Sequence, residues 1–163
     1  MTIFNKTFWK FAALFAVIIF LAGGAIWLDR YYQWRKSPQY QAEKYIKEME
    51  QKYREDTYGG NTPEETLQFF IDALKNGDTD LAAKYFVVDK QEEWKNQLAD
   101  GKKNDHLNLI IEIIEKPKTG KEIYDGAYLY TVIPDKNKVV EFTISLTKNK
   151  ATNKWKIEDM WNL

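Results

Sequence analysis

An uncharged segment near the N-terminus restricts this chain more than any other feature of its sequence. The 18 residues from Phe11 to Leu28 contain no charged side chain. As an α-helix, at roughly 1.5 Å per residue, they would span about 27 Å, close to the thickness of the hydrocarbon layer of a bilayer. Aromatic residues flank both ends, as is typical of helices that cross a membrane. We therefore predict a membrane span whose residues include Phe11, Leu14, Ile18, Leu21 and Trp27.

A cleavable signal peptide is the alternative interpretation of this segment. Lys6 and Lys10 would supply its basic start. The tetrad Leu-Ala-Gly-Gly at 21–24 resembles a lipoprotein signal, but Gly24 stands where such a signal requires a cysteine, and the chain has none. The apolar run also continues for four residues beyond Gly24, which is longer than such a signal usually extends. We predict an uncleaved signal anchor over residues 1–30.

Charges beside the span nearly balance, so they carry little information about its orientation. Lys6 and Lys10 precede the span, and Arg30, Arg35 and Lys36 follow it. The positive-inside rule is therefore close to a tie. A short N-terminal anchor followed by one domain is the usual way to tether an exported domain. We predict a single-pass protein of the cell membrane with a short cytoplasmic N-terminal tail and an extracytoplasmic C-terminal domain.

Residues 31–61 are predicted to form a helical linker or stalk. Pro38 interrupts the helix, because the residue before a proline is driven out of the helical conformation. Apolar residues then recur at spacings of four, three and four, in one narrow stripe formed by Ala42, Ile46, Met49 and Tyr53. The stripe allows a coiled-coil stalk that joins two copies into a homodimer, or a solvated spacer helix. We favour the spacer because the stripe covers too few heptads for a coiled coil.

Residues 62–163 are predicted to form one folded domain that begins with helices. Thr62 and Glu65 form a capping-box pattern at the start of the first helix, and Gly77 suits its end. A second, short helix is predicted next, with Asp78 or Thr79 as its cap. A third is predicted over Asp89–Gly101, where Trp94 and Leu98 would anchor it.

The rest of this domain is predicted to be an antiparallel sheet of about four strands. The expected strands are 106–115, which is rich in Ile, and Glu122–Ile133, Lys138–Lys148 and Lys154–Leu163. Turns are expected at 117–120, 134–137 and 149–153. Helices followed by antiparallel strands indicate an α+β fold in which the helices cover one face of a curved sheet.

Several local patterns of this domain occur together in one known fold. They are a Thr-Pro-Glu-Glu start, a helix that ends in Asn-Gly-Asp, a short Ala-rich helix, and a last strand that contains Lys-Trp-Lys-Ile. The residues concerned are Pro63, Phe70, Ala73, Leu74, Gly77, Asp78, Ala82, Trp155 and Ile157. In this respect residues 62–163 resemble the nuclear transport factor 2-like superfamily, a cone-shaped (cystatin-like) α+β fold, and in particular its small bacterial exported domains. The resemblance implies a cavity between sheet and helices, and frequent dimers through the open face of the sheet.

Asp159 is the residue that most suggests chemistry. In a regular strand it shares a face with Trp155, Ile157 and Trp161, where a carboxylate is costly unless it is paired or lies at the mouth of a cavity. The alternative places Asp159 at the rim of the sheet or bonded to backbone. We favour that alternative and predict no catalytic residue.

The resemblance nevertheless implies a possible site around Asp159. Some enzymes of the superfamily use a cavity carboxylate as a base, with tyrosine hydroxyls that stabilise an oxyanion. Here Tyr124, Tyr128 or Tyr130 could supply that hydroxyl. The candidate ligand-binding set is therefore Asp159, Tyr128, Tyr130, Trp155 and Trp161.

Composition excludes several classes of site. The chain has no cysteine and one histidine, which excludes a zinc finger, a cysteine nucleophile and a multi-histidine metal site within the chain. The zero net charge is the sum of +2 over residues 1–28, +1 over 29–61 and −3 over 62–163. A mildly acidic domain argues against a nucleic-acid partner. We predict no metal, no cofactor and no nucleic acid.

These observations predict a membrane-anchored extracytoplasmic binding or scaffold domain without catalytic activity. Its partners would be membrane lipid, through residues 11–28, and an envelope protein or a small apolar ligand in the cone. One alternative is a cavity-based enzyme similar to isomerases or cyclases. Another is a scaffold component of a type IV secretion-like envelope complex, because scaffold proteins of those systems also join one N-terminal span to a domain of this fold. The excess of Lys over Arg is expected of an AT-rich bacterial genome.

Overall fold

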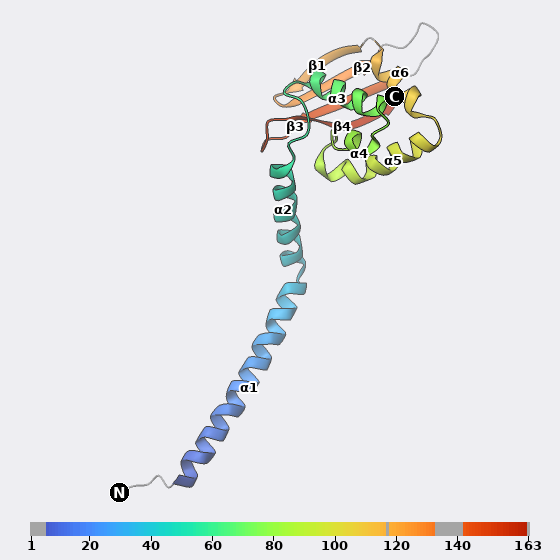
Figure 1. Cartoon of the computed structure of the whole chain (residues 1–163). Coiled ribbons are helices and arrows are strands. Elements are labelled where there is room, and N and C mark those ends of the chain that lie inside the picture. Colours follow the sequence, from blue (N-terminus) through green and yellow to red (C-terminus); the bar gives the residue numbers. More distant parts are fainter. Residues whose placement is uncertain (1–5, 117, 133–141, 163) are drawn as a thin grey trace. The chain divides into compact units, whose positions relative to one another are not determined.

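The computed structural model describes residues 6–116, 118–132 and 142–162 of the chain (Figure 1). It divides into two compact units, Met1–Glu48 and Met49–Leu163. The fold is α+β, as predicted: a long apolar N-terminal helix, further helices and a four-stranded antiparallel sheet.

The N-terminal unit contains the helix α1 (Lys6–Lys36) and most of α2 (Pro38–Glu55). The segment Phe8–Lys36 is long and apolar enough to cross a membrane, and none of its most apolar window is buried. The predicted interruption before Pro38 is confirmed. Ser37 separates the two helices, and its hydroxyl accepts a hydrogen bond from the backbone N–H of Tyr40 at 3.3 Å.

Four helices and a short 3₁₀ turn precede the sheet in the second unit. They are α3 (Pro63–Lys75), α4 (Thr79–Ala83), the turn η1 (Val88–Lys90), α5 (Gln91–Lys103) and α6 (Leu107–Glu115). The predicted caps are present. Thr62 Oγ1 accepts from the N–H of Glu65 at 3.2 Å, and Asp78 accepts from the N–H of Leu81 at 2.9 Å. Gly77, at φ +67°, takes the left-handed conformation that ends α3.

The prediction of a strand over 106–115 is wrong, because this segment forms α6. Its buried residues, Leu107, Ile111 and Ile114, recur at helical spacing and pack into the core. The Ile-rich composition suggested a strand, but the packing of one face against α3 decides the conformation.

The four strands form a meander in the order β1-β2-β3-β4. They are β1 (Lys118–Tyr124), β2 (Ala127–Val132), β3 (Phe142–Lys148) and β4 (Trp155–Asn162). The first hairpin corrects two predictions: 118–120 is strand rather than turn, and the predicted strand Glu122–Ile133 is divided by a turn at Gly126, which has φ +80°. The turn at 149–153 is confirmed. The turn predicted at 134–137 lies outside the described residues.

A bulge in β4 corrects the prediction that Asp159 and Trp161 share a face with Trp155 and Ile157. Leu146 of β3 pairs with Ile157, whereas its neighbour Ser145 pairs with Asp159, so Glu158 is an extra residue. One extra residue exchanges the two faces of a strand. Beyond the bulge Met160, rather than Asp159, packs against the core.

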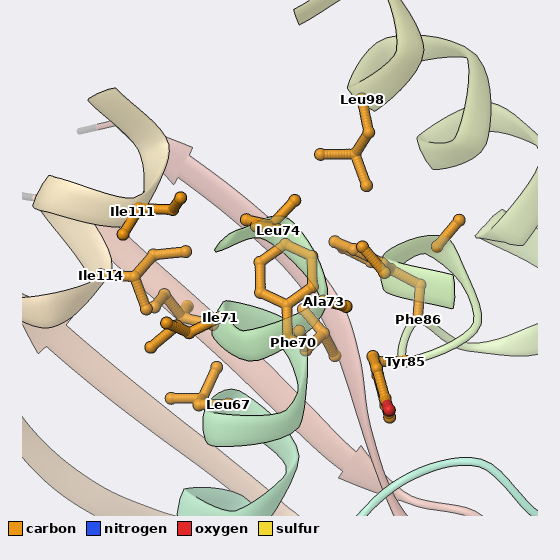
Figure 2. Close-up of a cluster of buried hydrophobic side chains, with 14 of the residues drawn as sticks. Leu67, Phe70, Ile71, Ala73, Leu74, Tyr85, Phe86, Leu98, Ile111 and Ile114 are labelled. Atoms are coloured by element: carbon orange, nitrogen blue, oxygen red, sulfur yellow. The ribbon is translucent and has the colours of Figure 1, made fainter. Parts of the chain in front are cut away.

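The core lies between α3, α6 and one face of the sheet (Figure 2). Phe70 of α3 packs edge-to-face against Phe86 with 5.5 Å between ring centroids. Phe86 also stacks on Trp94 of α5, with 4.2 Å between ring centroids. In Figure 2 the side chains of α3 lie between those of α6 and those of Tyr85 and Phe86. Aliphatic side chains, with a few aromatic rings among them, thus fill the space between helices and sheet.

Candidate functional site

Three of the predicted ligand-binding residues lie together on the core face of the sheet. The ring of Tyr128 lies 4.9 Å from that of Tyr130 and 6.3 Å from that of Trp155, in an edge-to-face arrangement. Tyr130 and Trp155 belong to the hydrophobic core, and Tyr128 packs against it. Tyr124 does not join them, because it is two-thirds exposed on the edge strand β1.

The other two predicted residues, Asp159 and Trp161, follow the bulge in β4, which places them on the other face of the strand. The carboxylate of Asp159 accepts a hydrogen bond from Lys90 Nζ at 2.8 Å and another from the backbone N–H of Met160 at 2.9 Å. The Asp159 side chain is 42% exposed. The predicted set is therefore divided between the core and the other face, and Asp159 does not approach the tyrosine hydroxyls.

Tyr130 is held by a carboxylate of the first turn of α3. Its hydroxyl donates a short hydrogen bond to Glu64. Burial, and then this hydrogen bond, raise the pKa of Tyr130 above its ordinary value. Burial acts to raise the pKa of Glu64, but the hydrogen bonds that the carboxylate accepts, from Tyr130 and from the start of α3, together with the charge of Lys118, lower this pKa below its ordinary value. Because its proton is already engaged, the phenol is poorly placed to donate to a substrate oxyanion.

Sequence reasoning missed a buried ion pair between Lys156 and Asp56. The Lys156 side chain is completely buried, and its ammonium lies 2.6 Å from Asp56 Oδ2. It also donates to the backbone carbonyls of Lys84 at 2.6 Å and Tyr58 at 3.3 Å. An ammonium has three N–H donors, and each has an acceptor here. Burial lowers the pKa of Lys156, and Asp56 opposes that shift.

Gln91, at the start of α5, completes the network around this pair. Its side-chain amide donates to Asp56 Oδ2 at 3.2 Å and to the backbone carbonyl of Phe86 at 3.1 Å. The other oxygen of Asp56 accepts from the N–H of Tyr58 at 3.2 Å. The network fastens the segment 56–60 onto the sheet, and the N–H of Trp155 bonds to the carbonyl of Gly60 at 2.9 Å. Its polar atoms bond to one another, which makes it a structural lock.

No local sequence pattern indicates this lock, because its two charges are 100 residues apart. Its consequence is visible in the boundary of the folded unit. The compact unit begins at Met49, ahead of the domain predicted to start at residue 62. Residues 49–61 belong to it because they supply the carboxylate and the backbone acceptors that Lys156 requires.

Two open pockets lie on the surface of the folded unit. One, of about 340 Å³, is bordered by charged residues that include Lys52, Glu55, Lys84 and Glu92. The other, of about 380 Å³, lies between α5 and α6. Its wall combines the apolar side chains of Trp94, Leu98 and Ile110 with the polar side chains of Gln97, Asp100, Asn104 and His106.

Within the described residues, no group of three or more His, Asp or Glu side chains is placed to hold a metal ion. Comparison of the chain with models of known protein families, with curated proteins and with solved structures finds no match.

Proposed function

We propose that this protein is a single-pass membrane protein in which an uncleaved N-terminal signal anchor tethers an extracytoplasmic binding or scaffold domain. The exposed apolar surface of α1 carries the proposal. Phe15, Phe20 and Leu21 are each about two-thirds exposed or more, and the whole of the most apolar window is uncovered. A helix that is apolar on all sides requires an apolar surrounding, which a bilayer provides.

The packed interior of the folded unit argues against acid–base catalysis there. Its aromatic rings pack against one another, Asp159 pairs with Lys90, and Tyr130 donates to Glu64. The pocket between α5 and α6 is instead open at the surface, where another molecule can reach it. We propose this pocket as a contact site for an envelope protein. The order of helices and meander is compatible with the nuclear transport factor 2-like superfamily as the origin of the domain.

The absence of cysteine makes the anchor and its orientation directly testable. Single cysteines are introduced as Thr2→Cys and Lys150→Cys, and intact cells are treated with a membrane-impermeant maleimide. We expect Lys150→Cys to be labelled and Thr2→Cys to be protected until the membrane is opened. The reverse pattern would overturn the orientation. Release of the full chain by alkaline carbonate would overturn the anchor.

Photo-cross-linking in intact cells tests the binding function. A photoreactive residue is placed at Gln97, in the pocket between α5 and α6, and as a matched control at Lys150, in the exposed turn before β4. We expect a discrete protein adduct from position 97 and none from position 150. Equal or absent adducts at the two positions would contradict a partner site in this pocket.

A further inference from the structure

We propose that the junction between α1 and α2 binds the phosphate groups of anionic membrane phospholipids. The binding surface, which we call the collar, consists of Trp27, Arg30, Tyr31, Trp34, Arg35 and Tyr40. The inference rests on the proposed function, because it requires α1 to cross a bilayer. It adds a class of lipid and the residues that recognise it.

The length of α1 places the collar at the level of the lipid headgroups. The helix has 31 residues, whereas the uncharged segment 11–28 is 18 residues long. That segment alone covers about 27 Å of a hydrocarbon layer that is about 30 Å thick. The helix therefore continues through Asp29–Lys36 into the headgroup region, where tyrosine and tryptophan side chains are typically found.

The aromatic residues of the collar form one continuous row. Trp27 stacks on Tyr31 with 5.7 Å between ring centroids, and Tyr31 lies 6.2 Å from Trp34. Across the break between the helices, Trp34 lies 4.5 Å from Tyr40. Tyr31, Trp34 and Trp27 are nevertheless between 39% and 65% exposed. The rings support one another and leave surface for lipid.

Arg35 is positioned by this row. Its guanidinium carbon lies 5.5 Å from the centre of the Tyr31 ring and 6.0 Å from that of Tyr40. A guanidinium between rings loses less conformational freedom when it binds, and its planar set of N–H donors matches two oxygens of a phosphate. Lysine lacks the planar set of donors.

The break between the helices holds Tyr40 beside Arg35. Ser37 caps α2 through the N–H of Tyr40, and the side chain of Gln41 donates to the backbone carbonyl of Arg35 at 2.7 Å. Together the two bonds hold the turn between α1 and α2. The position of Tyr40 beside Arg35 is therefore fixed by hydrogen bonds of the junction.

The charge of the collar region selects anionic lipid. Residues 29–36 carry three basic side chains and one acidic side chain. The chain contains only three arginines, and two of them, Arg30 and Arg35, lie here. The cationic side chains of this segment attract negatively charged headgroups, and arginine adds a bidentate contact to their phosphate.

The test uses the full chain in bilayers of phosphatidylcholine mixed with phosphatidylglycerol. The protein is released gently, and the lipids retained on each molecule are counted by native mass spectrometry. We expect the native chain to retain phosphatidylglycerol in preference to phosphatidylcholine. The double variant Arg30→Gln/Arg35→Gln should lose roughly tenfold of that preference, which corresponds to about one strong charge-assisted contact.

Three single variants, Arg35→Gln, Arg35→Lys and Arg54→Gln, separate the effects of charge, geometry and position. Arg35→Lys keeps the charge but lacks the planar fork, and we expect it to lose most of what Arg35→Gln loses. Arg54→Gln removes the third arginine, outside the collar, and we expect no change. Full retention by Arg35→Lys, or an equal loss in Arg54→Gln, would overturn the proposal. Carbonate extraction of the same variants distinguishes the two inferences: a failed anchor releases protein, whereas a failed collar leaves it in the membrane without lipid preference.

Discussion

Lys156 is the residue whose surroundings differ most from what its type suggests. It lies between Trp155 and Ile157 in a strand, where alternation predicts an exposed lysine. In the folded unit it is fully buried against Asp56 and two carbonyls. Removing two charges from water is costly, and their attraction offsets that cost only when all hydrogen bonds are made. The pair therefore stabilises the fold only as a complete set.

Substitution of one partner should be far more harmful than substitution of both. We expect Lys156→Met to lower the free energy of unfolding by about 3–5 kcal/mol, because Asp56 is left buried without its cation. The double variant Lys156→Met/Asp56→Leu should regain much of that loss. Urea unfolding followed by tryptophan fluorescence measures both. In the control Lys95→Met, an exposed pair with Asp80 is removed, and less than about 1 kcal/mol should be lost. A Lys156→Met variant as stable as this control would contradict the lock.

Asp159 should tolerate neutralisation. Its pair with Lys90 has side chains that are 42% and 33% exposed, so solvent screens the interaction. We expect Asp159→Asn to lower the free energy of unfolding by less than about 1 kcal/mol, since the amide oxygen can still accept the N–H of Met160. The same urea titration measures this. A loss above about 3 kcal/mol would mean that the carboxylate is essential to the core.

At the scale of elements, α6 shows how a helix can resemble a strand. Four of the nine residues in its sequence, LNLIIEIIE, are isoleucine, a β-branched residue that favours strands. The polar residues Asn108, Glu112 and Glu115 carry the overlooked signal, because their spacings of four and three place them on one side of a helix. The period of the polar residues was therefore more informative than the type of the apolar ones.

Gly120 of β1 should matter to the first hairpin. A Cβ atom at this position would lie 2.5 Å from the Tyr128 hydroxyl oxygen and 2.8 Å from a ring carbon of Tyr130. These rings pack on each other, the Tyr128 ring also packs on Trp155, and the Tyr130 hydroxyl bonds to Glu64, so the rings cannot move freely. We expect Gly120→Ala to lower the free energy of unfolding by about 1–3 kcal/mol, as overpacking does.

Gly101, inside α5, provides the matched control for this substitution. Its nearest neighbour for an added Cβ is a methyl group of Leu107 at 3.6 Å, an ordinary contact distance. We expect Gly101→Ala to raise stability by about 0.5–1 kcal/mol, because alanine favours a helix more than glycine does. Thermal unfolding of the two variants should thus shift in opposite directions. Shifts in the same direction would contradict the packing around Gly120.

At the scale of the molecule, the folded unit begins inside α2, at Met49. We expect the fragment 49–163 to be soluble and to unfold in one cooperative thermal transition. The fragment 62–163 should lack that transition, because it removes Asp56 and the Gly60 carbonyl that pairs with Trp155. Near-ultraviolet circular dichroism during heating measures both. Cooperative unfolding of the shorter fragment would show that the lock is dispensable.

The elements that could be predicted are those encoded by neighbouring residues. The apolar helix α1 follows from an uncharged run, and the ends of α3 follow from Thr62 and Gly77. The strand β3 follows from the alternation of apolar and polar residues over 142–147. In each case the interacting groups lie within a few residues of one another. The candidate site was less predictable, since only Tyr128, Tyr130 and Trp155 of the five proposed residues lie together.

The sequence by itself determined that this protein has an apolar segment long enough for a membrane, followed by helices and an antiparallel sheet. Tertiary structure decided which side chains meet. One extra residue in β4 turned Asp159 away from the core, and a segment before the predicted domain covered Lys156. The physical reason is the separation along the chain over which each interaction acts. Periodicity and capping act over one or two turns of chain, whereas the face of a strand and the partner of a buried charge depend on contacts between residues up to 100 positions apart.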